Sequence, residues 1–120
     1  MTINIRSTGI EVTETLREHI ERTLAFALDR FAPRIENVSV FLADLNGPRG
    51  GVSTLCQITA RLASGRPINI LQHHSEIEAG IKYATERMKT AISRTLNRVK
   101  RQVRVLSKSS VRAQAVALAN

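Results

Sequence analysis

The chain has 120 residues, with 18 Lys and Arg against 10 Asp and Glu, which gives a net charge of +8. This length suits one domain that buries about two-thirds of its unfolded surface. An apolar content of 42% and a charged content of 23% exclude a wholly disordered chain. No apolar run is longer than residues 24–28, which are far fewer than the ~20 residues of a membrane helix. The single cysteine, Cys56, excludes an internal disulfide and a cysteine-based zinc site.

The positive charge is confined to the last third of the sequence. Residues 1–80 carry 8 basic and 9 acidic side chains, whereas residues 81–120 carry 10 basic and 1 acidic side chain. Between Arg87 and Arg112 there are nine Lys or Arg and no acid. A local excess of this kind indicates a polyanionic partner, either a nucleic acid or an anionic membrane.

The first part of the chain predicts a strand, a helix and a second strand. Residues 2–7 alternate between apolar and polar side chains, as a half-buried strand does. Apolar residues at spacings of four and three then predict a helix over about 14–31. Thr13 is the expected N-cap of this helix, and Pro33 closes it. The second strand begins near Ile35.

The second part predicts two more strands and a long helix. A glycine-rich and proline-rich hairpin loop at 44–51 precedes strands over 52–62 and 68–72. Ser75 to Glu78 fits a capping box, and the apolar stripe that follows continues for about thirty residues. We expect residues 1–106 to form the domain and residues 107–120 to be a mobile, basic and alanine-rich tail.

The order β-α-β-β-β-α, with one apolar stripe on each helix, predicts an α+β fold. The simplest packing that buries both stripes is a four-stranded, mostly antiparallel sheet with both helices on one face. We expect the other face to be polar, lined by side chains such as Ser39, Gln57 and Thr59. Because the chain has only four aromatic residues, a nucleic-acid partner would be contacted through its backbone rather than read by base stacking.

The basic side chains of the long helix are the candidate binding site, and we expect them to lie opposite its apolar stripe. They are Arg87, Lys89, Arg94, Arg98, Lys100, Arg101 and Arg104. The planar guanidinium of Arg can hold two phosphate oxygens. A face that served only solubility would mix signs, because like charges on a helix cost ~0.2–0.5 kcal/mol per pair. A nucleic acid is therefore favoured over a solvated face and over a membrane surface, which would need the apolar stripe that covers the sheet.

The other candidate residues carry weaker signals. Arg49, in the glycine-rich loop, is a possible second phosphate contact, but the loop lacks the Lys-Ser/Thr ending of a P-loop. His73 and His74 point apart at a strand end and make a poor metal pair. Cys56 lies on the inward face of a strand and is interpreted as a core residue. We expect no catalytic residues, no metal, no cofactor and no small-molecule substrate.

Three segments resemble a known family. Residues 1–5, MTINI, are similar to its opening strand, and residues 9–17, GIEVTETLR, to the start of its first helix. Ala79-Gly80-Ile81, followed by Ala84, Arg87 and Met88, is similar to the start of its second helix. The chain thus resembles the short form of the ribosome hibernation-promoting factor and ribosome-associated inhibitor family, also called the sigma-factor modulation family, over about residues 1–105.

The resemblance implies a cytoplasmic protein that inhibits translation under stress and does not bind a membrane. Such a protein binds ribosomal RNA in the decoding channel of the small ribosomal subunit and blocks the mRNA and tRNA sites. Arg87 and Arg94 match positions that are usually basic in the family, and Arg98, Lys100 and Arg101 extend the same face. We expect a monomer, and ribosome dimerisation by this chain alone is not implied. A stand-alone double-stranded RNA-binding module and a protein-interaction modulator of transcription stay open as alternatives.

Overall fold

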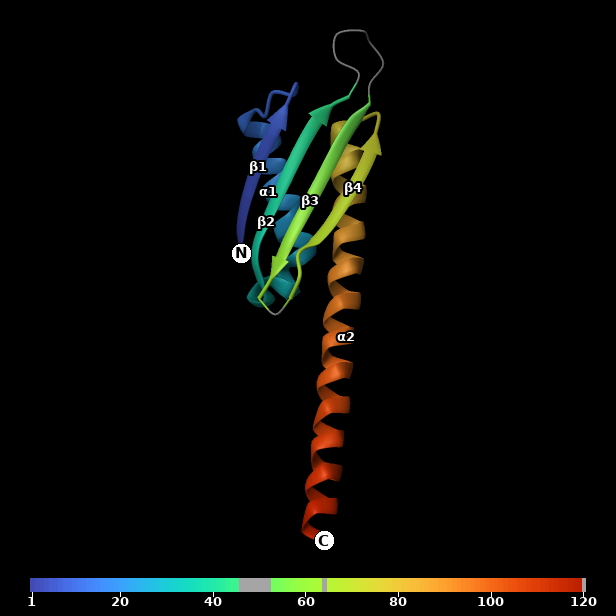
Figure 1. Ribbon diagram of the computed structural model, residues 1–120. Coiled ribbons are helices and arrows are strands. Elements are labelled where there is room, and N and C mark those ends of the chain that lie inside the picture. Colours follow the sequence, from blue (N-terminus) through green and yellow to red (C-terminus); the bar gives the residue numbers. More distant parts are fainter. Residues whose placement is uncertain (46–52, 64, 120) are drawn as a thin grey trace.

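A four-stranded sheet and two helices make up the fold, shown as a computed structural model in Figure 1. The elements are β1 (Thr2–Thr8), α1 (Glu14–Leu28), the 3-10 helix η1 (Asp29–Arg34), β2 (Ile35–Asp44), β3 (Thr54–Leu62), β4 (Ile68–His74) and α2 (Ile77–Ala119). The structure describes residues 1–45, 53–63 and 65–119, and the side chains of these up to residue 101. The element order is the predicted β-α-β-β-β-α.

The strands lie in sequence order across the sheet. β1 is parallel to β2, whereas β2–β3 and β3–β4 are antiparallel. The parallel pair follows from the helix between its strands, because parallel neighbours need a crossover connection, whereas hairpins join antiparallel ones. Both helices cover the same face of the sheet (Figure 1). These observations confirm the predicted α+β architecture.

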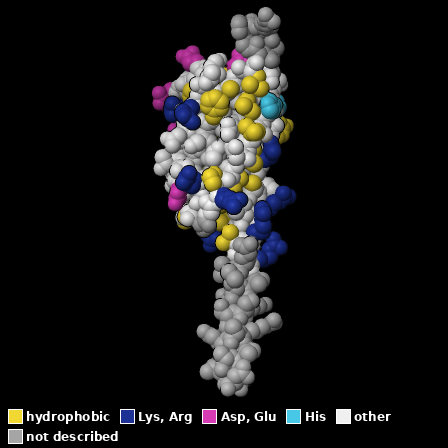
Figure 2. All heavy atoms as spheres, viewed as in Figure 1, with side chains coloured by type: hydrophobic (Ala, Val, Ile, Leu, Met, Phe, Trp, Pro, Cys, Tyr) yellow, Lys and Arg dark blue, Asp and Glu magenta, His cyan; other side chains and the backbone are white. Residues whose placement is uncertain are grey.

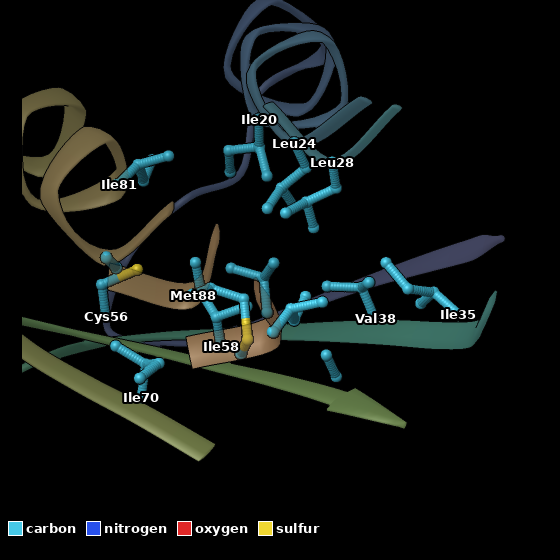
Figure 3. Packing of buried hydrophobic residues seen from close by; sticks show 14 of the residues in the cluster. Ile20, Leu24, Leu28, Ile35, Val38, Cys56, Ile58, Ile70, Ile81 and Met88 are labelled. Atoms are coloured by element: carbon cyan, nitrogen blue, oxygen red, sulfur yellow. The ribbon is translucent and has the colours of Figure 1, made fainter. Parts of the chain in front are cut away.

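The core lies between the helices and this inner face. Ile20, Leu24 and Leu28 recur every four residues on α1, are fully buried and point toward the strands (Figure 3). Met88 packs from α2, and Ile58 lies at the centre of the inner face. Buried residues alternate along β2 and β3, because successive side chains of a strand point to opposite faces. The apolar patterns in the sequence therefore identify the core-facing sides of these elements correctly.

The two helices begin in different ways. Thr13 caps α1 as predicted, and its side-chain oxygen accepts a hydrogen bond of 3.2 Å from the backbone N–H of Leu16. The capping box predicted at Ser75 and Glu78 does not form. Instead Nδ1 of His74 accepts the backbone N–H of Glu76 at 2.9 Å. Helix α2 begins at the next residue, Ile77.

The face of the sheet away from the helices, called here the open face, is polar at one end only. The strand register places Asn4, Ser39, Thr59 and Asn69 in one row across the four strands. The next row is Arg6, Phe41, Gln57 and Leu71, followed by Thr8, Ala43, Leu55 and His73. The expected polar face is correct for Ser39, Gln57 and Thr59. It is wrong for the other end, where Figure 2 shows a patch of hydrophobic side chains.

Helix α2 is longer than predicted. It has 43 residues, so the molecule measures 75 Å along one axis but only 24 Å and 17 Å along the others. Ile92 is its last buried side chain within residues 77–101, and Leu96 packs partly against the core. Beyond this point the helix projects from the sheet (Figure 1). Residues 107–119 continue the helix, and the mobility expected of residues 107–120 stays a prediction.

The centre of the core offers a direct stability test. Ile58→Ala removes a side chain that is 0% exposed, between both helices and the sheet. We expect the free energy of unfolding to fall by about 2–5 kcal/mol, through lost apolar burial and a residual cavity. Leu71→Ala is the matched control, because Leu71 is 50% exposed on the open face. Urea denaturation should show a loss below about 1 kcal/mol for the control, and equal losses for the two variants would contradict this core.

Thr85 offers a substitution that should stabilise the fold. Its side chain is 1% exposed, and its hydroxyl oxygen has no hydrogen-bond partner. A buried polar group without a partner costs about 1–3 kcal/mol, and valine has nearly the same shape without the hydroxyl. Thr85→Val should therefore raise the free energy of unfolding by about 1 kcal/mol. Thr90→Val is the control, since the Thr90 hydroxyl is exposed and donates to the Glu86 carbonyl at 3.2 Å; no gain is expected there.

Candidate nucleic-acid interface

The basic side chains predicted on α2 form one surface, called here the basic ridge. Its described members are Arg87, Lys89, Arg94, Arg98, Lys100 and Arg101. All are exposed except Lys89, which is half-buried. No ion pair joins any of these six side chains to an acid within the part of the protein that the structure describes. Figure 2 shows Lys and Arg gathered along the lower part of α2, beyond β4. Their charge is therefore available to a partner.

The basic ridge consists of two groups of side chains along α2. Arg87, Arg94, Arg98 and Arg101 are spaced by seven, four and three residues, and so follow one side of the helix. Lys89 and Lys100 lie roughly 140° around the axis from these arginines, at 100° per residue. The apolar stripe lies on the other, wider arc, so both groups are turned away from the sheet. The projecting part of α2 therefore presents basic groups on both flanks.

Arg87 is held in place by the edge of the sheet. Its Nη1 donates to the carbonyl oxygen of Leu71 at 2.6 Å and to Oε1 of Gln72 at 3.0 Å. Nε and Nη2 make no hydrogen bond to the described residues, which leaves one edge of the guanidinium for another acceptor. The sequence offers no signal for Gln72, because fifteen positions separate it from Arg87.

Arg87 and Arg94 share a shallow recess between β4 and α2. Ile70 forms its floor from β4, and Glu86, Thr90 and Ala91 complete its lining; its volume is about 370 Å³. A guanidinium at each end suits a phosphate group, which Arg holds through two parallel hydrogen bonds. Glu86, at the N-terminal end, is the last acid before the basic segment. The attraction for a polyanion therefore increases from Arg94 toward the projecting part of α2.

A second hollow lies between α1 and α2 and has a different character. Its volume is about 650 Å³, and Glu76, Glu78 and Glu86 line it together with Arg22 and Lys82. Acids and bases are mixed here, so the groove does not extend the attraction of the basic ridge. The site for a polyanion is therefore one side of the molecule and not its whole surface.

Two predicted contacts fall outside the parts that the structure describes. Arg49 lies in residues 46–52, and the side chain of Arg104 lies beyond residue 101. Both stay predictions.

Cys56 and His74, outside the basic ridge, serve the fold. Cys56 is 1% exposed, and burial raises the pKa of its thiol to about 11. The ring of His74 stacks on Tyr83 with centroids 5.4 Å apart, whereas His73 is exposed on the open face. Within the described residues, no three His, Cys, Asp or Glu side chains gather as a metal site would require. In the same part of the chain, no helix is long and apolar enough to cross a membrane.

Comparisons with known proteins agree with this geometry. A family model described as sigma 54 modulation protein / S30EA ribosomal protein matches residues 3–108. The N-terminal domain of Thermus thermophilus Protein Y has the same fold, with a TM-score of 0.67 and 23% identity over 79% of this chain and 99% of that one. A ribosomal subunit interface protein from Coxiella burnetii gives a TM-score of 0.66 and 17% identity over 81% and 99%. Among curated proteins none matches significantly.

The buried thiol provides a further prediction. At pH 8 the rise in pKa from 9.0 to about 11 makes the thiolate fraction of Cys56 roughly a hundredfold smaller than in the unfolded chain. A thiol reagent should therefore react slowly with the native protein and rapidly in urea. Because the folded state holds this proton more tightly, the free energy of unfolding should fall as the pH rises from about 9 to 11. Equal labelling rates in the native and unfolded states would contradict the burial.

Proposed function

The chain belongs to the sigma 54 modulation protein / S30EA ribosomal protein family, and from this we propose that it binds ribosomal RNA of the small subunit through its basic ridge. Family membership makes it a ribosome-associated modulation protein. The finer proposal is that it occupies the decoding channel and excludes mRNA and tRNA. The observation that supports it most is the run of basic side chains on α2 that have no acid partner, as far as the side chains are described, to residue 101.

The shape of α2 suits a groove lined with phosphates. A single α-helix with its side chains is about 10–12 Å across. After Leu96 no described strand lies beside α2 (Figure 1). RNA can therefore approach Arg98, Lys100 and Arg101 from both flanks at once. Arg94 lies closer to the sheet, where the same RNA would meet the recess at β4. Contacts of this kind fix position and orientation on RNA without reading its sequence.

In this proposal, occupying the decoding channel is sufficient to inhibit translation. The sheet and its two helices stay rigid around one core, while the basic ridge supplies the affinity. A body of this kind, anchored in a channel that mRNA and tRNA must share, excludes both by steric overlap. The family consists of modulation proteins and is not known for enzymes, and we propose that this chain acts as a monomer in the cytoplasm, with no cofactor.

Charge reversal on α2 tests the proposal. Replacing Arg94, Arg98 and Arg101 by Glu should weaken co-sedimentation with small ribosomal subunits by at least about tenfold at low salt. The matched control replaces Arg17, Arg22 and Arg34 by Glu, all exposed and away from the basic ridge, with the same change in net charge. The control should pellet nearly as the parent does. For the parent, log affinity should fall with log salt by roughly 0.7–0.9 per phosphate contacted.

Four outcomes would contradict the proposal. The parent protein remains in the supernatant with small subunits at low salt, or both triple variants bind equally. Equally tight binding to an arbitrary RNA duplex would favour a general double-stranded RNA-binding module instead. Binding to a protein partner that is insensitive to salt, with no affinity for RNA, would favour a modulator of transcription.

A further inference from the structure

The apolar end of the open face is the feature that the basic ridge does not explain. Phe41 on β2, Leu55 on β3 and Leu71 on β4 come together there through the strand register. Leu71 is 50% exposed, and Phe41 and Leu55 are partly exposed. The patch is visible in Figure 2 because both helices lie on the other side of the sheet. His73 borders it on β4.

Amide groups of fixed orientation lie beside this patch. Oδ1 of Asn69 accepts hydrogen bonds from Nε2 of Gln57 at 3.0 Å and from Oγ1 of Thr59 at 2.9 Å. This arrangement leaves the Nδ2 donors of Asn69 and the Oε1 acceptor of Gln57 unused. A donor next to an acceptor on a neighbouring amide suits the hydrogen-bonding edge of a nucleobase.

Guanidinium groups stand at both edges of the sheet in the same row. Arg6 on β1 lies directly across from Phe41 in the register. At the opposite edge, the guanidinium of Arg87 is bound to the carbonyl of Leu71. The basic ridge therefore begins where the apolar patch ends. An RNA strand with its phosphates along the ridge can turn its bases over β4 onto the open face.

We propose that the open face binds unpaired nucleotides of single-stranded RNA. One base stacks on Phe41 and the next on His73, with Leu55 of β3 between them, while Asn69 and Gln57 bond to base edges. Arg6 and Arg87 hold the flanking phosphates. This inference rests on the proposed function, since it takes RNA as the partner, and it adds a second surface that selects single strands.

A second copy of the chain fits this surface less well. A symmetric dimer places the same patch on both subunits. Two copies packed through the open face would therefore bring Arg6 and Arg87 of both chains into one interface without an acid in the three rows. An RNA strand, in contrast, supplies phosphates that can pair with these guanidinium groups.

The fold also changes what the small number of aromatic residues means. Phe31 is buried, Phe26 is 88% exposed on α1, and Tyr83 stacks on His74 at the start of α2. Only Phe41, of the four, lies on the open face. The small number of aromatic residues in the sequence favoured backbone contacts over base stacking. Only the fold shows that Phe41 lies beside the amide groups of Gln57 and Asn69.

NMR titration of the full chain labelled with ¹⁵N tests the inference. One sample receives a single-stranded RNA of six nucleotides, and another a blunt RNA duplex of the same length, both at low salt. We expect amides of β2, β3 and β4 to shift with the single strand only, and amides of α2 to shift with both. Phe41→Leu should lower the single-strand affinity roughly tenfold, as loss of one base stack does. Phe26→Leu, the matched control on α1, should leave it unchanged.

The other possible results of the titration distinguish failure of this inference from failure of the proposed function. If the single strand shifts α2 but not the open face, or if Phe41→Leu binds normally, the inference fails and the proposed function stands. If neither RNA shifts any amide, the inference fails as well, and co-sedimentation with small subunits decides the proposed function separately. Open-face shifts that grow with protein concentration in the absence of RNA would assign the patch to a second copy. Asn69→Asp is the second variant, which keeps the shape and should weaken single-strand binding by placing an anion beside the bases.

Discussion

The burial of one side of α2 against the sheet is the contact on which the other features depend. Ile81, Ala84, Met88 and Ile92 are fully buried there and hold the helix along β3 and β4. Because these residues fix the rotation of α2 about its axis, they also fix which directions its basic side chains take. The core thus determines the position of the interface, although no basic residue belongs to the core.

The same contact sets the limit between the rigid and the projecting parts. Up to Leu96, α2 has a sheet beneath it, and Arg87 is tied to β4 through Leu71 and Gln72. Beyond Leu96 the helix has no neighbouring element, and the density of like charge rises. Like charges destabilise an isolated helix. A polyanion that neutralises them would therefore stabilise the projecting part as it binds.

The sequence predicted most of the fold because each element carries a clear period. Val38, Val40 and Leu42 alternate along β2, and Ile20, Leu24 and Leu28 recur along α1, so their buried sides were evident. What failed depended on contacts between distant residues. Phe41 and Leu71 form an apolar end only through the register of three strands. The predicted capping box at the start of α2 failed for a local reason, since the hydrogen bond found there joins His74 to the amide of Glu76.

The basic side chains of α2 were predicted residue by residue, but the link from Arg87 to Gln72 required the packing of α2 on β4. The central claim is that this ridge lies on ribosomal RNA in the small subunit. Cryo-electron microscopy of the chain on small subunits tests it most directly. The account predicts density in the decoding channel, with Arg94, Arg98 and Arg101 against RNA phosphates. Density elsewhere on the subunit, or with α2 facing solvent, would contradict it.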